Sequence, residues 1–545
     1  MTHGDFINAA RPLASVDYFD EIIDEIRTGK LKTGWDVERA KMRLCSKHKM
    51  ATLPTNADIL ERLAGDERER FEPLLRIKPV RSASGVAVVA VMTSPADCPH
   101  GKCSYCPGGT GVGTPQSYTG HEPAALRAGQ NEYDPFRQVS SRLSQLSAIG
   151  HPVDKIDLII MGGTFTSRPW EYREKFVRRC LDAMNGRESG TLAEARALNE
   201  QAPARCIGLT VETRPDCIAP VQNRETLLLG GTRIEMGVQS LDDATLVKVA
   251  RGHDVGATVH ATRLAKDAGF KVGYHMMPGL PDATVEGDAA MFLKLFDDES
   301  FRPDMLKIYP TLVMPGTKLH AEWEAGRYKP FTTEDVVRLL AIVKPQLPPW
   351  VRISRIQRDI PAQLIADGVK KSHVRTLAQQ ELARQGKRCR CVRCREAGHV
   401  LLEGRSVDEA QIAENCISYG ASGGTEHFLS FDEPASDALV GYLRLRITSG
   451  EARCASLGLE NAPENGPVAL VREVKVFGQM VPIGQSATDE YQHRKYGARL
   501  LETAERIALE TGADQITVTS GVGVRDYYRK FGYELKSMGM VKSLK

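Results

Sequence analysis

The chain has 545 residues, a formal net charge of +3 and 42% hydrophobic residues, which is ordinary for a water-soluble globular protein. This length predicts about three or four domains. No apolar stretch approaches about 18 residues, so we expect no membrane span. The start of the sequence lacks the apolar run of a signal peptide, and we expect a cytoplasmic protein. With so small a net charge, a nucleic-acid surface would have to come from local basic patches.

Residues 1–80 are predicted to form a helical, basic N-terminal segment. Apolar residues have helical spacing between Tyr18 and Ile26. Seven basic residues with few acids among them follow: Lys30, Lys32, Arg39, Lys41, Arg43, Lys47 and Lys49. Two interpretations stay open, a solvated helix face and a surface that contacts phosphates.

Three cysteines lie within nine residues, at Cys98, Cys103 and Cys106, directly after the apolar run Val86–Met92. Three thiolates can bind three irons of a 4Fe-4S cluster and leave the fourth iron open for a ligand. Zinc also suits short cysteine spacings, so the spacing alone leaves both metals possible. Twelve cysteines in a chain without a secretion signal favour metal binding or catalysis over a disulfide framework.

Strands alternate with helices from Val86 to about Ile360, which predicts parallel βα units. Helices such as Trp170–Asn185 and Thr258–Ala268 separate the strands. The expected strands are Val86–Met92, Ile156–Met161, Cys206–Val211, Arg233–Gly237, Val272–Met276 and Met305–Ile308. We expect an α/β fold in which residues 81–360 form a full or partial TIM-type barrel, with its site at the carboxyl ends of the strands.

Two motifs at predicted strand ends are candidates for ligand binding. Gly162-Gly163-Thr164 follows a buried strand, and glycines there let a ligand approach the backbone closely. Glu212 and Arg214 follow the next strand. They could pair with each other, or with the amino and carboxylate groups of an amino-acid-like ligand. Single histidines at similar strand ends, His253 and His275, are interpreted as structural residues.

Residues 361–404 form a basic linker. Nine Lys or Arg stand against one acid, Glu381, between residues 370 and 395, and this density favours contact with nucleic acid. Within it, Cys389, Cys391 and Cys394 predict a structural zinc site, with a second iron–sulfur cluster as the alternative. The candidates for a fourth zinc ligand are His373, His399 and Cys416.

Residues 405–545 are predicted to form a separate α/β domain. The expected strands are Ala438–Ile447, Val468–Phe477 and Gln515–Val518. The loop from Gln492 to Ala498 opens a helix with good apolar spacing, and free N–H groups at a helix N-terminus suit a pyrophosphate. Tyr527 and Tyr528 begin a short helix after the last of these strands.

The motifs resemble two known superfamilies. The loop of Cys98, Cys103 and Cys106 resembles that of radical S-adenosylmethionine (SAM) enzymes, with one extra residue between the first two cysteines. Gly162-Gly163-Thr164 resembles the motif of that superfamily for the SAM amino group. The loop 492–498 resembles the acetyl-CoA loop of GNAT acetyltransferases, with Lys495 where a glycine is usual.

A radical SAM domain followed by a GNAT-like domain resembles the family of Elongator catalytic subunits. Further matching motifs are Cys98-Pro99-His100, Glu212-Thr213-Arg214-Pro215-Asp216 and Tyr527-Tyr528-Arg529-Lys530. The resemblance implies an acyltransferase that modifies C5 of the wobble uridine of tRNA, giving 5-carboxymethyluridine. It implies a 4Fe-4S cluster, SAM, acetyl-CoA and zinc, with a SAM-derived radical activating the acetyl methyl group.

The resemblance also implies roles for individual residues. Cys98, Cys103 and Cys106 would hold the cluster, and Lys155 and Tyr528 would take part in catalysis. The residues implied to bind SAM or acetyl-CoA are Gly162, Gly163, Thr164, Glu212, Arg214, Lys155, Glu473, Val474, Lys475, Val476, Gln492, Tyr496, Gly497, Ala498 and Tyr528. The two sites are expected to face one another, with the interdomain surface as the active cleft.

The implied partners are the anticodon stem-loop of tRNA, acetyl-CoA, an unidentified electron donor, and either Elongator-like subunits or a second copy of the chain. The main alternative is a protein lysine acetyltransferase that uses only the GNAT-like domain, with a structural cluster. Two further alternatives are another radical SAM reaction on RNA, such as methylthiolation, and a non-enzymatic tRNA-binding scaffold.

Overall fold

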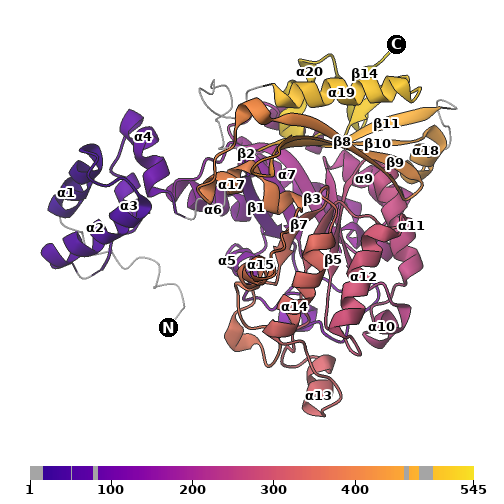
Figure 1. Cartoon of the computed structure of the whole chain (residues 1–545), viewed down its shortest axis with the longest axis horizontal. Coiled ribbons are helices and arrows are strands. Elements are labelled where there is room, and N and C mark those ends of the chain that lie inside the picture. The colour runs from indigo at the N-terminus through magenta and orange to yellow at the C-terminus, as the bar shows by residue number, and fades with distance from the viewer. Residues whose placement is uncertain (1–15, 51, 78–83, 460–465, 478–494) are drawn as a thin grey trace. The chain divides into compact units, whose positions relative to one another are not determined.

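The computed structural model describes residues 16–50, 52–77, 84–459, 466–477 and 495–545 (Figure 1). The chain divides into two compact units, residues 1–82 with 142–153, and residues 83–141 with 154–545. Within the described ranges, no helix is long and apolar enough to span a bilayer. All twelve cysteines lie within the described residues, and none forms a disulfide.

The first unit is helical, as predicted. It contains α1 (Val16–Arg27), α2 (Gly34–Lys47), α3 (Asn56–Leu60) and α4 (Gly65–Leu75), and their apolar faces share one core. Several of the basic side chains are paired with acids: Lys30 and Arg43 with Glu25, each at 2.5 Å, and Lys47 with Glu21 at 2.7 Å. These pairs favour the interpretation of a solvated helix face for part of this segment.

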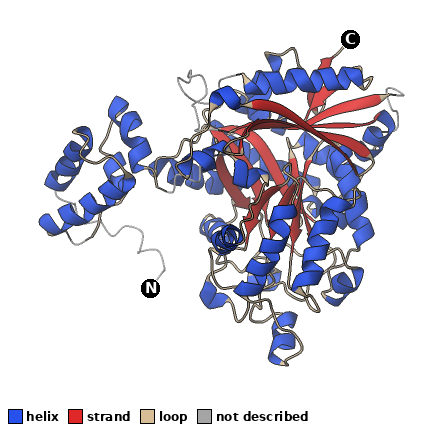
Figure 2. Ribbon diagram, in the orientation of Figure 1, coloured by secondary structure: helices blue, strands red, loops and turns tan. Residues whose placement is uncertain are grey.

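Seven parallel strands form the first sheet of the second unit, in the order β1-β2-β3-β4-β5-β6-β7 (Figure 2). The strands are β1 (Ala87–Met92), β2 (Lys155–Met161), β3 (Arg205–Thr213), β4 (Arg233–Gln239), β5 (Lys271–Met276), β6 (Met305–Ile308) and β7 (Arg352–Ile356). The spatial order repeats the chain order, which gives the partial barrel that the βα repeat predicts. Six of the strands match the expected ones closely, and β7 was not among them.

Helices lie between these strands along the chain, and most of them cover the outer face of the sheet (Figure 1). They are α5 (Pro123–Gln130), α6 (Pro135–Ala148), α7 (Trp170–Asn185), α8 (Leu192–Asn199), α9 (Pro220–Leu228), α10 (Asp243–Lys248), α11 (Val255–Asp267), α12 (Val285–Asp297), α13 (Lys318–Glu324) and α14 (Thr333–Val343). The linker region then adds three more helices, α15 (Val374–Arg384), α16 (Val392–Arg395) and α17 (Ala397–Leu402). The linker is therefore packed structure rather than an extended connection.

A second, mixed sheet forms the C-terminal part, in the order β13-β14-β12-β11-β10-β9-β8. Its strands are β8 (Ala413–Ala421), β9 (Gly424–Glu433), β10 (Ala438–Ser449), β11 (Pro467–Val476), β12 (Gln515–Val518), β13 (Glu534–Lys536) and β14 (Gly539–Ser543). β11 and β12 are the parallel pair. The helices are α18 (Gly450–Leu457), α19 (Tyr496–Glu510) and α20 (Arg525–Arg529), and α19 packs along β10 and β11 (Figure 1).

Buried arginines join the second sheet to the amino ends of the first. Arg472 of β11 donates to both oxygens of Asp304, at 2.6 and 2.8 Å, directly before β6. Arg444 of β10 donates to the carbonyl of Trp350 at 2.7 Å, just before β7. Paired, hydrogen-bonded charges are tolerated in an interior, whereas loss of one partner leaves an uncompensated charge. These contacts fix the C-terminal sheet at the amino ends of the half-barrel strands.

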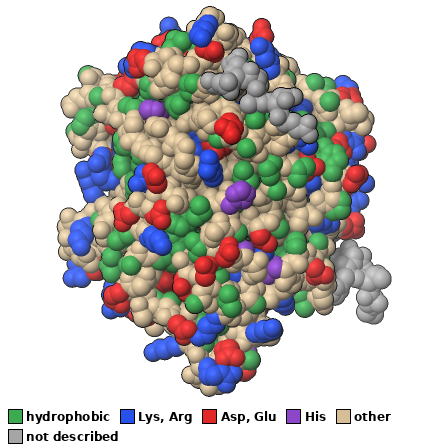
Figure 3. Space-filling view, turned by 90° about the vertical axis from the view of Figure 1, so that its right-hand side faces the viewer, with side chains coloured by type: hydrophobic (Ala, Val, Ile, Leu, Met, Phe, Trp, Pro, Cys, Tyr) green, Lys and Arg blue, Asp and Glu red, His purple; other side chains and the backbone are tan. Residues whose placement is uncertain are grey.

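Positive and negative side chains are interspersed over the face of the molecule that Figure 3 shows. This agrees with the small net charge of the chain. Any surface for a nucleic acid on that face is therefore made of small basic areas rather than one continuous field.

Candidate active site

A pocket opens at the carboxyl ends of the first sheet, where a parallel α/β fold places its site. It gathers the motifs that the sequence singled out at four strand ends. Its lining includes Cys98, Cys106, Gly163, Thr164, Glu212, Arg214, Gly237 and His275, together with Tyr105, Tyr118, Arg251, Met161, Tyr309 and Arg358. Segments from residue 98 to residue 360 thus contribute to one site.

The three cysteines after β1 are surrounded by hydrogen-bond donors. The Ser117 amide donates to the sulfur of Cys106 at 3.1 Å, and the Arg251 guanidinium to that of Cys103 at 3.6 Å. The Nε2 atom of His100 lies 3.1 Å from the Cys103 sulfur. Donors of this kind stabilise negative charge on sulfur, so the loop suits three metal-bound thiolates.

The spread of these three sulfurs favours a cluster over a single ion. In tetrahedral zinc sites with Zn–S bonds of about 2.3 Å, the sulfurs lie about 3.8 Å apart. Across the described parts of the chain, two groups of three ligands have all their atoms within 4.8 Å, and this loop is not one of them. The residues present therefore fit a 4Fe-4S cluster, and fit zinc poorly.

The glycines after β2 bring the backbone close to this loop. Gly162 and Gly163 have backbone φ angles of 120° and 100°, which residues other than glycine rarely adopt. A Cβ at Gly162 would lie 2.2 Å from Thr93 Oγ1, and one at Gly163 would lie 3.9 Å from the Cys98 sulfur. Thr164 Oγ1 is 3.5 Å from the same sulfur. The motif is therefore adjacent to the cysteine loop, as its proposed SAM role requires.

Glu212 and Arg214 do not pair with each other, contrary to one of the two expectations. Arg214 forms a bidentate pair with Asp216, at 2.9 Å for each contact, and donates to the Arg251 carbonyl at 2.8 Å. Glu212 accepts from Tyr118 at 2.8 Å and from Lys307 at 3.3 Å. Glu212 keeps its place in the pocket lining.

Lys307 of β6 organises a buried group of charges behind the pocket. Its ammonium contacts the carboxylates of Glu212 and Glu235, and Glu235 also bonds to His275 Nε2 at 3.1 Å. Burial would raise the pKa of Glu235, but the charge of Lys307 and the bond from His275 outweigh it and hold that pKa well below its usual range. The ligand atoms of Glu212, Glu235 and His275 lie close enough together to bind one metal ion, but the ammonium of Lys307 already balances the charge of the two carboxylates.

Two histidines near the cysteine loop are neutral at physiological pH. Burial lowers the pKa of His100 to about 4, and the charges of Arg214 and Arg251 add to the effect. Burial and Arg251 likewise lower the pKa of His253 to about 4. His253 lies 3.3 Å from the Gly237 carbonyl, which agrees with its interpretation as a structural residue.

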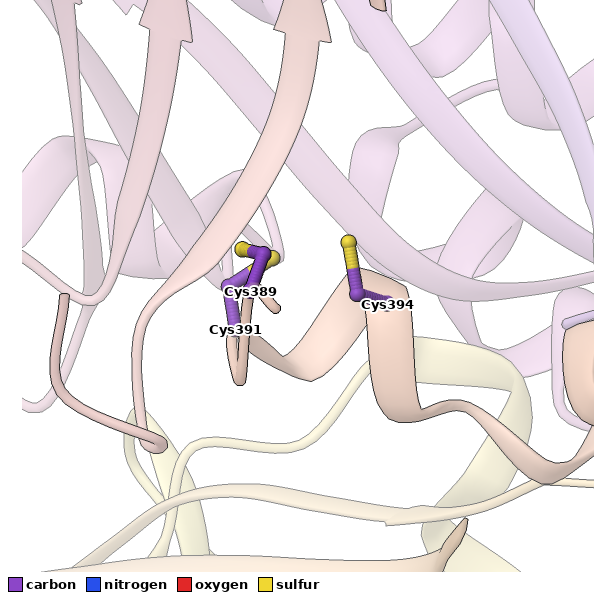
Figure 4. A group of neighbouring side chains, drawn as sticks. All are labelled: Cys389, Cys391 and Cys394. Atoms are coloured by element: carbon purple, nitrogen blue, oxygen red, sulfur yellow. The ribbon is translucent and has the colours of Figure 1, made fainter. Parts of the chain in front are cut away.

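The second cysteine group is compact. Cys389, Cys391 and Cys394 are one of the two groups, among the described residues, whose ligand atoms all lie within 4.8 Å of one another. Figure 4 shows Cys389 and Cys391 on a loop and Cys394 on the short helix α16. Hydrogen bonds from Cys389 and Cys394 hold the pKa of Cys391 well below its usual range. The donor set and spacing fit zinc. None of His373, His399 and Cys416 lies within that distance of all three cysteines, and the fourth ligand stays a prediction.

The residues expected to bind acetyl-CoA lie in the second sheet. Glu473, Val474, Lys475 and Val476 end β11 and are all partly exposed. Tyr496, Gly497 and Ala498 begin α19, and Lys495 before them has a φ of 63°. This left-handed conformation explains why a glycine is usual at that position. Gln492 falls outside the described residues.

Tyr528 is buried in α20, and its neighbour Tyr527 lies closer to the loop. A Cβ at Gly497 would already lie 2.3 Å from the Tyr527 hydroxyl. Burial, with smaller effects of Tyr527 and Glu473, raises the pKa of Tyr528 above its usual value. The Tyr528 phenol is therefore a proton donor rather than a base at neutral pH.

Lys155 and the interdomain surface lie away from the pocket. Lys155 is the first residue of β2, at the amino end of the sheet, whereas the pocket is at the carboxyl ends. The contacts of Arg444 and Arg472 place the C-terminal sheet at that same amino end. The pocket thus lies at the opposite end of the parallel strands from this interface, and the expectation that the interdomain surface is the active cleft stays a prediction.

The sequence did not single out several residues of the site, among them Tyr118, Glu235, Lys307 and Arg358. One signal was available. Glu235 and Lys307 are charged residues inside strands whose other residues are mostly apolar, as in a buried strand. A charge in such a place needs a partner.

Comparison with known proteins agrees with this site. The radical SAM superfamily matches residues 93–292, the Radical_SAM C-terminal domain residues 303–384, and the ELP3 N-terminal domain residues 15–83. A tRNA uridine(34) acetyltransferase of Methanocaldococcus jannaschii is 45% identical over 96% of this chain and 97% of its own length. Elongator complex protein 3 of Homo sapiens is 42% identical over 97% of this chain and 96% of its own.

A solved structure shares most of the architecture. Elp3 of Methanocaldococcus infernus, with an N-terminal deletion, matches with a TM-score of 0.73 and 43% identity, over 84% of this chain and 99% of that one. Radical SAM proteins use a 4Fe-4S cluster and SAM, and the cysteine loop described above fits that cluster. By sequence and by fold, the chain belongs to the family of Elongator complex protein 3 and the archaeal tRNA uridine(34) acetyltransferases, which are radical SAM transferases.

Proposed function

We propose that this protein is a tRNA uridine(34) acetyltransferase that works as a carboxymethyluridine synthase, joining the acetyl unit of acetyl-CoA to C5 of the wobble uridine. The observation that carries the proposal is the convergence of the cysteine loop, Gly163, Thr164 and Glu212 on one pocket. The domain with β11, the strand expected to bind acetyl-CoA, packs against the amino ends of the same half-barrel. A protein acetyltransferase would need only the second of these features.

A 4Fe-4S cluster with SAM, when bound, supplies the radical chemistry that a new bond to an unactivated methyl carbon requires. Cys98, Cys103 and Cys106 would hold the cluster, and the donors around them would stabilise its negative charge. Gly162 and Gly163 would let SAM lie close to the backbone, within reach of that loop. Arg251, held by the Gly237 carbonyl at 3.2 Å, would keep the loop in place.

The remaining residues would bind and orient the substrates. Glu212, fixed by Tyr118 and Lys307, would present a carboxylate to a polar group of SAM. Glu473, Lys475 and the start of α19 would hold acetyl-CoA, and Tyr528 would donate a proton to the leaving thiolate. Cys389, Cys391 and Cys394 would bind zinc and stabilise the linker against β7 and β10. The basic linker and the ELP3 N-terminal domain would contact the tRNA.

The test is nucleoside mass spectrometry on unmodified tRNA, incubated without oxygen with reconstituted enzyme, reductant and acetyl-CoA, with and without SAM. We expect a carboxymethyl adduct of uridine only when SAM is present, and none with the Cys103→Ala variant. Acetylation of a protein lysine without SAM or tRNA, and no nucleoside adduct, would instead establish the lysine acetyltransferase alternative.

A further inference from the structure

The pocket at the carboxyl ends of the strands is larger than one small ligand needs. Its empty volume is about 1250 Å³ including the open mouth, whereas pockets for one small ligand measure about 300–1,000 Å³. Gly163, Thr164 and Glu212 line it from the ends of β2 and β3. Because the strands follow in order from β1 to β7, the side chains after β6 and β7 line a different part of its wall. That part is available to a second substrate.

Arg358 brings a positive charge into this second part of the pocket. It lies two residues after the end of β7 and contacts the loop that follows β1, at the opposite edge of the sheet. Its Nη2 atom donates to the Ser117 carbonyl, and the Ser117 amide donates to the sulfur of Cys106 at 3.1 Å. Ser117 thus connects Arg358 to the cysteine loop and fixes its guanidinium near the metal-binding thiols.

A carboxylate lies beside this guanidinium. Glu122 also lines the pocket, and one of its oxygens lies 3.4 Å from Arg358 Nη2. The side chain of Glu122 is 7% exposed, and that of Arg358 is 24% exposed. The amide and the hydroxyl of Thr119 both donate to Glu122 at 3.1 Å and hold the carboxylate in place. The pocket therefore presents a fixed donor and a fixed acceptor side by side, where water is largely excluded.

Both side chains keep hydrogen-bonding capacity for a ligand. Across the described parts of the chain, every hydrogen bond of Arg358 uses Nη2, so Nε and Nη1 have no partner in the protein. Neither of these two atoms is enclosed by protein. A carboxylate has about four lone-pair sites, and the donors to Glu122 are the Thr119 amide, the Thr119 hydroxyl and Arg358. Glu122 can therefore accept one further hydrogen bond.

Tyr309 adds an aromatic ring to the same part of the pocket. It directly follows β6 and lines the wall with Arg358. Its ring packs edge-on against that of His275, with 5.5 Å between the ring centroids. Aromatic side chains stack against bases that have left an RNA stack. The wall after β6 and β7 thus combines a stacking surface with a donor and an acceptor.

We propose that Arg358 and Glu122 recognise the Watson–Crick edge of the wobble uridine, with Arg358 donating to O4 of the uracil and Glu122 accepting from its N3–H. This proposal rests on the proposed function, in which that uridine is the substrate. An enzyme that does chemistry on a base takes it out of the stack and recognises it by hydrogen bonds to this edge. O4 and N3–H are neighbours on uracil, as the donor and the acceptor are in the pocket.

The pair makes the enzyme selective for uracil over cytosine. Cytosine has an amino donor where uracil has O4, and an acceptor nitrogen where uracil has N3–H. In the same orientation, cytosine would set a donor against Arg358 and an acceptor against Glu122. A site built to hydrogen-bond a ligand rejects an analogue that leaves its buried polar groups unpaired. The same contacts orient the reacting atom, because C5 is bonded to the carbon that carries O4.

Two tRNA transcripts that differ only at position 34, with uridine or cytidine there, test the proposal. Glu122→Gln keeps the shape of the side chain and turns part of the acceptor into a donor, and Arg358→Gln removes the guanidinium. The matched controls are Glu286→Gln and Arg338→Gln, which change an exposed ion pair on α12 and α14. Nucleoside mass spectrometry measures kcat/KM for each transcript with the reconstituted full-length enzymes.

We expect the unaltered enzyme and both controls to prefer uridine by about a hundredfold, because two hydrogen-bonding positions discriminate. Glu122→Gln and Arg358→Gln should each reduce this preference by about tenfold, chiefly through slower reaction of the uridine transcript. Iron content and SAM binding should be unchanged in both variants, which separates a contact to the base from damage to the rest of the site.

A crosslink gives a second readout that needs neither SAM nor reductant. 4-Thiouridine has a sulfur in place of O4, and on irradiation it forms a covalent bond to a residue beside that atom. With 4-thiouridine at position 34 of the tRNA, we expect peptide mapping to place the bond within residues 117–122 or at Arg358. This measurement uses the unaltered protein, so it remains decisive if a variant does not fold.

A preference for uridine that neither Glu122→Gln nor Arg358→Gln changes would overturn the proposal. So would a crosslink outside the pocket, or lost SAM binding in Arg358→Gln, which would assign the guanidinium to SAM. Equal products from the two transcripts with the unaltered enzyme would refute the proposal and retain the proposed function. A crosslink in the pocket without any carboxymethyl product would retain the recognition of the base and refute the proposed function.

Discussion

Lys307 of β6 and Glu235 of β4 form an ion pair inside the half-barrel, across the intervening strand β5. Glu235 is 3% exposed and Lys307 12%. The pair therefore fixes the charges behind Glu212 in an interior from which water is largely excluded. A buried pair of this kind stabilises the fold only while both members are present.

We predict that Lys307→Met lowers the free energy of unfolding by about 3–5 kcal/mol, because it leaves Glu212 without its cation and Glu235 with only Arg233, at 3.4 Å. Chemical denaturation of the two proteins at pH 7 measures the difference. The double variant Lys307→Met with Glu235→Gln should recover part of the loss, since only Glu212 then lacks its partner. A single variant as stable as the unaltered protein would contradict the role given to Lys307.

The two cysteine groups should hold different metals. We predict that Cys103→Ala loses iron and the brown absorption of the cluster while keeping zinc, and that Cys391→Ala loses zinc while keeping iron. The reason is the difference in spacing, since the second group alone has its sulfurs within the reach of one ion. Metal analysis of protein purified without oxygen measures both, with circular dichroism as the control for folding. Loss of iron on changing Cys391 would instead assign the second cluster to that group.

The sequence predicted the elements of the half-barrel well because strands with buried faces are made of β-branched and apolar runs. Ile156–Met161, for example, was expected and the structure begins that strand one residue earlier, at Lys155. β8 was not predicted, since most of its residues are exposed and polar and give no apolar alternation.

The contacts of the site were harder to predict than its members. The partner of Arg214 is Asp216, two residues away, and this pairing was within reach of the sequence. The pairing of Lys307 with Glu235 joins residues far apart in the chain and follows only from the order of β4, β5 and β6. The distance of Lys155 from the pocket likewise follows from the direction of β2, because Lys155 begins the strand and the pocket lies where the strand ends.

Gly162 is predicted to tolerate no side chain. Its φ of 120° is unfavourable for alanine, and the new Cβ would lie 2.2 Å from Thr93 Oγ1. We expect Gly162→Ala to weaken SAM binding by about tenfold or more, equivalent to about 1.4 kcal/mol, through displacement of the backbone beside the cysteine loop. Equilibrium dialysis with labelled SAM on the reconstituted enzyme measures this. Gly129→Ala is the matched control, because a Cβ there meets nothing within 4 Å, and it should bind SAM normally.

Asp288 should make the stability of the second unit depend on pH. It lies in the first turn of α12 and accepts from the Gly279 amide at 2.7 Å, in the loop that follows β5. Burial raises the pKa of Asp288 to about 6, and this hydrogen bond only partly offsets the effect. The folded state therefore binds a proton more tightly than the unfolded state, so the favourable contribution present below about pH 4 is lost as the pH rises through 6.

The variant Asp288→Asn removes this ionisation and keeps an oxygen that accepts from Gly279. We predict that it is more stable than the unaltered protein at pH 8 by up to about 3 kcal/mol, and equally stable at pH 4. Thermal unfolding of both proteins between pH 4 and pH 8 measures the difference. A constant difference across that range would mean that the Asp288 carboxyl does not titrate there. A variant less stable than the unaltered protein at pH 8 would mean that the Asp288 charge stabilises the loop after β5.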